Sequence, residues 1–454
     1  MFSREIVDEL KNWAAQPDRK PLVLRGARQV GKTVAVDLFA TGFDRYIHLD
    51  LQKPEDCDLF RQKLPVRQLV QLIALSKNVD LSSGRRLLFL DEIQNSPEAT
   101  AMLRYFYEEL PDLFVIAAGS LLEIMMEWSQ VSFPVGRVEY RYMYPVSFRE
   151  YLNAIGEVQA LKYYNEIPLQ PLAHARLLEL FHHYTMIGGM PEIVQNYAEQ
   201  RDVTVLRKIY EGLMATYLDD VAKYARSTTV AAHLRHAIET APLEAGKRIV
   251  FQNFGKSNYK SREMSEALKT LERAMLVKII YPTTRIQFPA QPDLKRSPRL
   301  QFLDTGLVNY RAGLQVEFFK HSDLHAFYNG LIAEHIAYQE IIAADSLSDQ
   351  KPVFWTRELK QSNAEVDYLL PFQNILIPVE IKSGKSGKLR SLHQFMNAVE
   401  HPYAIRLYAG ELNLQKTVTV AGKEFWLLNL PYFLAGKLND YAEWMITEIK
   451  KKCN

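Results

Sequence analysis

The sequence predicts a multidomain α/β protein in which a helical connector joins two regions of mixed helix and strand. Three observations predict this class. A glycine-rich loop follows a short apolar run near the amino end, an apolar run at 87–90 ends in two acids, and an alternating segment at 365–370 precedes another apolar run at 375–379. Apolar runs that alternate with helical patterns are typical of parallel sheets covered on both faces. The 454 residues are enough for about three domains of ordinary size.

The first element is a phosphate-binding loop. Residues 21–33 read PLVLRGARQVGKT, which has the G-x-x-x-x-G-K-T spacing. Gly26 and Gly31 allow positive φ and a close approach of the backbone to phosphate. The amides of 28–33 can then form an anion nest at the start of a helix. Lys32 would reach the β- and γ-phosphates of a bound nucleotide.

The residues predicted to bind the nucleotide are consecutive in this loop, with one serine from further along the chain. They are Gly26, Ala27, Arg28, Gln29, Val30, Gly31, Lys32, Thr33, Val34 and Ser120. The Thr33 hydroxyl would ligate Mg²⁺, so the predicted cofactors are ATP and Mg²⁺. The alternative is an ordinary glycine-rich turn before a helix. The extended run before the loop and the helical run at 34–39 favour the phosphate-binding loop.

The second element is the apolar run at 87–90, which predicts a buried strand that ends in Asp91 and Glu92. Asp91 would hold Mg²⁺ directly or through water, and Glu92 would polarise the attacking water. Two adjacent acids alone would also fit a solvated strand end. Their position after four apolar residues, downstream of Lys32, favours the catalytic interpretation.

Further short apolar runs at 46–49 and 113–118, with a helical pattern at 99–110, complete the prediction of a parallel, doubly wound sheet. Ligands bind beyond the carboxyl ends of the strands in such sheets. Ser120 follows the run at 113–118 and could sense the γ-phosphate. It could equally be the N-cap of a helix at 121–126.

Four segments together resemble a known family. The phosphate loop, LLFLDEIQ (87–94), AAGSLL (117–122) and GRVEYRYMYPVSFREYL (136–152) are similar to the bacterial and archaeal AAA+-type ATPases that carry a DUF4143 C-terminal region. The resemblance implies an AAA+-type P-loop ATPase core over 1–155. Ala118 stands where that family usually has threonine before Gly-Ser.

The resemblance also implies an arginine that completes the site, in some cases from a neighbouring subunit. Arg28, Arg137 and Arg141 are candidates by position, and a surface or packing role is the alternative for each. A homo-oligomer is therefore one expected form of the protein.

The middle of the chain reads as helical. Apolar residues recur at helical spacing over 172–187 and 203–224, and a Gly-Gly-Met-Pro break lies at 188–191. These helices predict a helical lid over 156–230.

A winged-helix connector is predicted over 231–320. An amphipathic helix at 261–274 is followed by strands at 276–281 and 299–302, and LQFLDTGLV (300–308) matches the usual segment of the resembled family. Basic residues in and before the helix could contact DNA phosphates. They are Lys256, Lys260, Arg262 and Lys269. Plain protein contact is the alternative, since acids are interspersed in the same helix.

A third group of residues predicts metal-assisted phosphodiester hydrolysis within 321–454. Asp367 and Glu380 would hold Mg²⁺ from neighbouring strands, and Glu334 from a preceding helix could complete the metal site. Lys382 is two residues from Glu380 and so points to the same face of its strand. It would orient or deprotonate the attacking water.

The order of helix, three strands, a helix at 388–399 and a strand at 403–408 resembles the PD-(D/E)xK nuclease superfamily. The resemblance implies a restriction-endonuclease-like α/β domain. A basic Gly/Lys-rich loop at 384–390 suits a phosphate backbone or an ordinary exposed turn. A strand pair with solvated charges, and an inactive member of the superfamily, are the alternatives.

Composition limits the cellular compartment and the kinds of partner that we expect for this protein. The chain is 48% hydrophobic and 24% charged, with a net charge of +2, so any basic surface is local. Two isolated cysteines, a charged beginning and the absence of a membrane-length apolar run predict a reduced, cytoplasmic protein with no membrane partner. The predicted function is an ATPase that couples hydrolysis to action on DNA through the nuclease-like domain. A nucleotide-dependent switch that binds a protein partner, and a plain DNA-binding regulator, are the alternatives.

Overall fold

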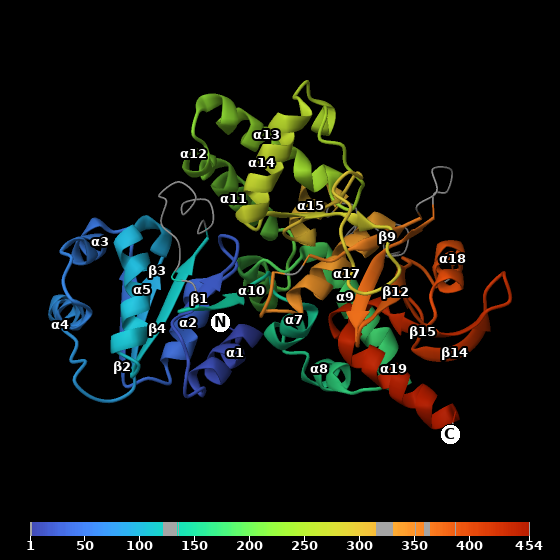
Figure 1. Ribbon diagram of the computed structural model, residues 1–454, viewed down its shortest axis with the longest axis horizontal. Coiled ribbons are helices and arrows are strands. Elements are labelled where there is room, and N and C mark those ends of the chain that lie inside the picture. The colour runs from blue at the N-terminus through green and yellow to red at the C-terminus, as the bar shows by residue number, and fades with distance from the viewer. Residues whose placement is uncertain are drawn as a thin grey trace. The chain divides into compact units, whose positions relative to one another are not determined.

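The computed structural model describes residues 2–120, 134, 136–314, 330–349, 351–357, 364–385 and 387–453. The chain divides into two compact units (Figure 1). The first consists of Met1–Tyr144, Thr270–Leu276 and Asp345–Asp349. The second consists of Pro145–Lys269, Val277–Ala344 and Gln350–Asn454.

The first unit contains the predicted parallel sheet. Its strands lie in the order β2-β3-β4-β1-β5, and every neighbouring pair is parallel. The strands are β1 Leu22–Arg25, β2 Arg45–Asp50, β3 Arg86–Asp91, β4 Leu113–Gly119 and β5 Glu139–Tyr142. The helices are α1 Glu5–Ala14, α2 Lys32–Ala40, α3 Pro54–Arg61, α4 Val66–Lys77 and α5 Pro97–Glu109.

Both faces of this sheet are covered, as the continuous apolar runs predict. On one face, Leu90 and Val115 join Leu103 of α5 in a buried cluster that also takes residues from α3 and α4. On the other face, the ring of Trp13 from α1 lies edge-on to Phe114, with centroids 6.0 Å apart. Because side chains alternate along a strand, Phe114 and Val115 serve opposite faces. The candidate site described below therefore lies at the edge of a sheet that is packed on both faces.

The second unit begins with the predicted helical region. Its helices are α7 Phe148–Ala154, α8 Val158–Asn165, α9 His174–Ile187, α10 Pro191–Gln200, α11 Leu206–Asp219, α12 Val221–Tyr224 and α13 Thr228–Glu244. The predicted break after the helical run at 172–187 is confirmed. The helix α9 ends at Ile187, and its C-cap residue Gly188 has φ 74° and ψ −170°. A helix and two strands follow, as expected: α14 Ser261–Arg273, and β6 Val277–Ile280 paired antiparallel with β8 Arg299–Phe302. The short helix α15 Thr305–Arg311 comes next.

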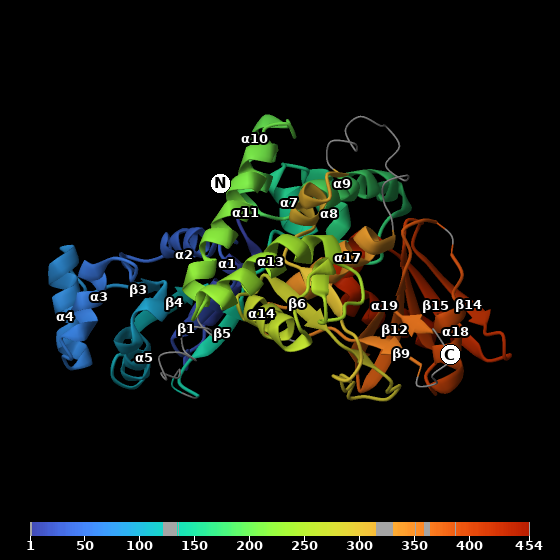
Figure 2. The same cartoon turned by 90° about the horizontal axis from the view of Figure 1, so that it is seen from above.

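The carboxyl-terminal part forms a mixed sheet in the order β11-β12-β13-β15-β14. Figure 2 labels β12, β14 and β15 of this sheet. Its strands are β11 Tyr368–Phe372, β12 Ile375–Ile381, β13 Tyr403–Tyr408, β14 Asn413–Val418 and β15 Glu424–Pro431. The accompanying elements are α17 Gly330–Ala343, β7 Pro282–Thr283, β9 Phe354–Thr356, β10 Glu365–Val366, α18 Arg390–Ala398 and α19 Leu438–Cys453. The alternating segment predicted as one strand is divided at Asp367 into β10 and β11.

The chain first passes from one unit to the other between Tyr144 and Pro145, whereas the first predicted boundary falls at 155. The finer division of the remainder into a lid, a winged helix and a nuclease-like domain stays a prediction. The helix expected at 121–126 lies outside the described residues. In the part of the chain that the structure describes, no helix is both long and apolar enough to cross a membrane.

Candidate functional site

The loop after β1 has the backbone that a phosphate-binding loop requires. Gly31 has φ 94° and ψ 25° and immediately precedes α2, a conformation that glycine adopts without steric cost. At Gly26 the constraint is space, because an added Cβ would lie 2.5 Å from the carbonyl oxygen of Met143. Gln29 also has a positive φ, of 65°. The first amides of α2 lack acceptors within the helix, so this end of the helix favours an anion.

Lys32 is folded back into the loop. Its Nζ donates to the carbonyl oxygens of Gly26 and Ala27, each at 2.9 Å. The side chain is buried, and this burial lowers the pKa of Lys32 to about 8, against the opposing effect of Glu92 and Asp91. A phosphate would offer the ammonium group anionic oxygens, which form stronger hydrogen bonds than carbonyl oxygens do.

The remaining loop residues line the same turn. Ala27 and Val30 are fully buried and fix the loop against the unit. Arg28 is half-buried, and Gln29 and Val34 are exposed. The loop therefore turns part of its backbone outward while its apolar side chains hold it in place.

Thr33 and Asp91 are brought together, as the two motifs predict. The Thr33 hydroxyl donates to Asp91 Oδ2 at 2.7 Å, and Asp91 Oδ1 accepts from the amide of Glu92 at 3.0 Å. Burial opposes ionisation of Asp91, but its contacts with His48 and Thr33 prevail and lower its pKa. A hydroxyl beside an ionised carboxylate is an oxygen-donor pair of the kind that Mg²⁺ prefers. These two side chains therefore fit a magnesium ion.

Glu92 and Ser120 follow the two neighbouring strands. Glu92 has φ 52° and ψ 45°, which turns the chain sharply after β3, and its carboxylate accepts from Gln94. Ser120 comes directly after β4, which lies between β1 and β3 in the sheet. In this register Arg25 is opposite Gly119. The topology therefore places Ser120 at the same edge as the loop and the two acids.

Two side chains at this site, His48 and Arg4, belong to none of the sequence motifs described above. His48 Nε2 lies 3.6 Å from Asp91 Oδ2, and this carboxylate raises the pKa of His48. Arg4 is buried and donates to the carbonyl oxygens of Val30, at 2.9 Å, and Tyr144, at 2.8 Å. His48 lies on β2, which pairs with β3. The alternation of side chains along these strands could therefore have indicated it. Arg4 carries no such local signal.

Two of the arginines proposed to complete the site have partners within the first unit. Arg137 donates to Glu108 at 2.8 Å, and the buried Arg141 lies 3.7 Å from Glu139. Arg28 lies close enough to Lys32 to lower the pKa of that lysine. The identity of a completing arginine, and with it the homo-oligomer, stays a prediction.

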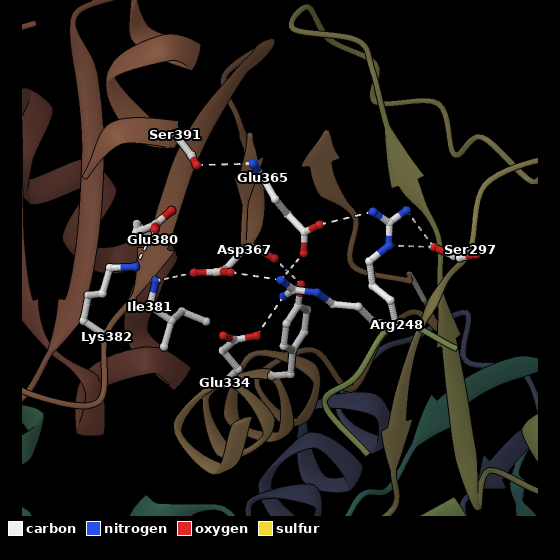
Figure 3. Close-up of polar contacts among 11 residues, drawn as sticks. Arg248, Ser297, Glu334, Glu365, Asp367, Glu380, Ile381, Lys382 and Ser391 are labelled. Atoms are coloured by element: carbon white, nitrogen blue, oxygen red, sulfur yellow. Dashed lines mark hydrogen bonds and ion pairs between the residues drawn. The ribbon is translucent and has the colours of Figure 1, made fainter. Parts of the chain in front are cut away.

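The predicted carboxyl-terminal residues Glu334, Asp367, Glu380 and Lys382 also come together (Figure 3), and Arg299 contacts two of them. Arg299 of β8 is 3.0 Å from Glu334 Oε2 through Nη1 and 3.1 Å from Asp367 Oδ1 through Nη2. The same Nη2 pairs with Glu365. Sequence reasoning missed Arg299, which lies 68 residues before Asp367.

Glu380 and Lys382 form the other side of this cluster. Lys382 Nζ donates to Glu380 Oε1 at 2.6 Å, so the two side chains share a face as predicted. Asp367 Oδ2 accepts from the amide of Ile381 at 2.8 Å. Burial and the neighbouring Asp367 raise the pKa of both Glu334 and Glu380.

Within the described ranges, no group of three or more histidine, cysteine, aspartate and glutamate side chains is arranged to hold a metal ion. For Glu334, Asp367 and Glu380 the structure supplies a reason, because Arg299 holds two of the three. Metal binding by these residues stays a prediction.

Three family models match the chain in succession. The first is described as an AAA domain and matches residues 18–152. Two domains of unknown function follow, DUF8612 at residues 178–317 and DUF4143 at residues 329–431.

Several solved structures are similar to the chain at low identity. The Walker-type ATPase PABY2304 of Pyrococcus abyssi is 15% identical, over 69% of this chain and 96% of that chain, with a TM-score of 0.43. AMPPCP-bound DnaA from Aquifex aeolicus is 13% identical, over 60% and 87%, with a TM-score of 0.25. The RuvB Holliday junction branch migration motor of Thermotoga maritima is 14% identical, over 65% and 93%, with a TM-score of 0.27. No curated protein has significant similarity to the chain.

The parallel sheet and the glycine loop therefore lie in the part of the chain that matches an AAA domain, residues 18–152. The DUF8612 and DUF4143 regions follow that domain, so the predicted resemblance to AAA+-type ATPases with a DUF4143 region is confirmed. The nuclease resemblance stays a prediction.

Proposed function

We propose that the protein hydrolyses ATP with Mg²⁺ at the edge of the first sheet. The single observation that carries this proposal is the 2.7 Å contact between Thr33 and Asp91, directly beside the buried Lys32. The loop amides and Lys32 would bind the triphosphate, and Thr33 and Asp91 would hold the metal ion. A bound Mg²⁺ neutralises charge that develops on the phosphates during transfer.

Glu92 is the residue that we propose to polarise the attacking water. It is adjacent to Asp91, and its left-handed backbone directs the chain away from the line of β3. Ser120 would sense the γ-phosphate from the neighbouring strand. Both assignments rest on placement at the carboxyl edge of the sheet, where ligands of such folds bind.

Glu92→Gln is expected to lower ATP turnover at least about a hundredfold, which is within the usual contribution of a general base. ATP affinity should change little, because Glu92 does not contact the phosphate loop in this role. Phosphate release measures turnover, and calorimetric titration with ATP and Mg²⁺ measures affinity. The control is Glu55→Gln, an exposed acid in the first turn of α3. If Glu92→Gln retained half of the parent turnover, Glu92 would not be the residue that polarises the attacking water.

A second candidate function is contact with DNA through α14. Arg262 and Lys269 are seven residues apart and so lie on one face of the helix, and both are exposed, as are Lys256 and Lys260 before it. Glu266 accepts from Arg262 Nε at 3.1 Å and offsets part of this charge. The face can therefore supply only a few phosphate contacts.

The combined variant Lys260→Ala, Arg262→Ala and Lys269→Ala is expected to weaken duplex DNA binding for all sequences alike. The slope of log affinity against log salt should fall by up to about three, since each lost phosphate contact removes roughly one unit. Fluorescence anisotropy with a labelled duplex at several salt concentrations measures this slope. Lys208→Ala, an exposed lysine on α11, is the matched control. A parent slope near zero would count against a phosphate-binding surface.

Action on DNA by the carboxyl-terminal region is the finer part of the proposal. Its support is the convergence of Asp367, Glu380 and Lys382 in one cluster. Hydrolysis there needs a divalent cation at the acids, and Arg299 holds Asp367. In the arrangement observed, the region fits the alternative of a nucleotide-dependent switch in which it binds a protein partner.

A further inference from the structure

We propose that the Arg299 guanidinium is an internal counter-cation that occupies the carboxyl-terminal acidic centre in place of a divalent metal ion. Mg²⁺ or Mn²⁺ then binds this centre only when Arg299 has left it. The inference does not depend on ATP hydrolysis, since it concerns a separate group of residues in the second unit.

Arg299 lies at the centre of the cluster. Its side chain is only 10% exposed and faces three carboxylates, those of Glu334, Glu365 and Asp367. Its guanidinium carbon also lies 4.8 Å from the centre of the Phe354 ring. Arginine does not lose its charge in proteins, so a metal ion cannot gain these acids through deprotonation of Arg299. The guanidinium has to move.

The charges of the cluster match a divalent ion once Arg299 is removed from the count. Among the described residues, four carboxylates meet here, and the cations that contact them are Arg248, Arg299 and Lys382. Without Arg299, four carboxylates face two cations. The excess of two negative charges equals the charge of one Mg²⁺ or Mn²⁺. With Arg299 present the excess is one, and the guanidinium itself already contacts Glu334 and Asp367.

An open acceptor also points to a missing cation. Glu380 Oε2 is buried and has no hydrogen-bond partner in the part of the chain that the structure describes, although Oε1 accepts from Lys382. The Glu380 side chain is only 7% exposed. Asp367 lies close to Glu380, because its Oδ2 accepts from the amide of Ile381, the next residue after Glu380, at 2.8 Å. Hard divalent cations take oxygen ligands of this kind, so a cation between these two acids would satisfy the unpaired oxygen.

Arg299 comes from a different segment of the chain than the acids do. It lies on β8, within the DUF8612 match at 178–317, whereas Glu334 and Asp367 lie within the DUF4143 match at 329–431. A displacement of β8 would therefore open the centre without any change in the acids themselves. Arg248 already contacts Glu365, at 3.4 Å, and would keep that carboxylate paired.

The test measures Mn²⁺ binding to the full chain without nucleotide. The parent carries Asp91→Asn, which removes a predicted metal ligand of the ATP site. Electron paramagnetic resonance detects free Mn²⁺, and the loss of its signal counts bound ions. Arg299→Met keeps much of the side-chain volume and removes the charge. It is expected to bind one Mn²⁺ at least about tenfold more tightly than the parent, because the unpaired acids attract the ion. Adding Asp367→Asn should abolish this binding.

Arg248→Met is the matched control, since it removes the other arginine that contacts Glu365 and leaves Arg299 in place. It should bind Mn²⁺ no better than the parent. If Arg299→Met does not fold, Arg299→Gln, which keeps a polar side chain and the charge excess of two, serves in its place. A folded Arg299 variant that binds Mn²⁺ no better than the parent would overturn the proposal. Tight binding by the parent that Asp367→Asn abolishes would overturn it as well, because metal and arginine would then share the centre.

Discussion

Lys32→Ala is expected to reduce kcat/KM for ATP at least about a hundredfold, the scale of losing one preorganised charged donor. The parent ammonium is buried and donates to the carbonyl oxygens of Gly26 and Ala27. Because burial has already removed most of the water around this ammonium group, little further desolvation free energy opposes its interaction with a bound phosphate. Alanine removes that interaction from both the bound and the reacting nucleotide. Both ATP affinity and turnover should therefore fall.

The control for this variant is Lys11→Ala. Lys11 is a lysine of the same unit, 63% exposed on α1, with Asp8 as its partner. Its loss should leave phosphate release unchanged. Circular dichroism verifies that both variants are folded. Undiminished ATP hydrolysis by a folded Lys32→Ala protein would remove the phosphate loop from the proposed function.

Gly188→Ala is expected to destabilise the second unit by at least about 3 kcal/mol. Gly188 has φ 74° and ψ −170°, a region of backbone conformation that is almost restricted to glycine. An added Cβ would lie 2.3 Å from Asp304 Oδ1 and 2.5 Å from the amide nitrogen of Gly306. Asp304 is fully buried and accepts from the amide of Gly189. Moving its carboxylate aside would leave buried polar groups without partners.

Gly212→Ala is the matched control for the backbone. Gly212 lies inside α11 and is exposed, with no atom within 4 Å of an added Cβ. There the same substitution should stabilise the protein by about 0.5–1 kcal/mol, because alanine favours a helix interior. Denaturant unfolding of both variants measures the difference. Equal stabilities would show that the turn at Gly188 relaxes around a methyl group.

The candidate nucleotide site could be located from the sequence because its parts are local. The loop is one contiguous motif, and Asp91 ends an apolar strand whose place in a parallel sheet follows from its pattern. Thr33 and Asp91 are then brought together by topology alone. Arg4 could not be found in this way, because it contacts the carbonyl of Tyr144, 140 residues further on.

The carboxyl-terminal region was predicted less completely. β12 and β13 are rich in buried apolar residues and were expected, but β14 was not. Its burial alternates between exposed and half-buried residues, so this edge strand has no apolar run that could indicate it. Arg299 stands on a strand that was predicted, yet its role depends on acids at 334, 365 and 367. Only the folded chain brings those charges together.

Arg4 ties the first unit's ligand-binding loop to the point where the chain leaves that unit. One guanidinium holds the carbonyls of Val30, in the loop, and Tyr144, directly before Pro145 begins the second unit. Hydrogen bonds from a charged donor contribute about 1.5–3 kcal/mol each. A loop that shifts as it closes on phosphate must therefore either carry residue 144 with it or break one of these bonds. Arg4 thus connects the candidate nucleotide site to the last residue before the chain first leaves this unit.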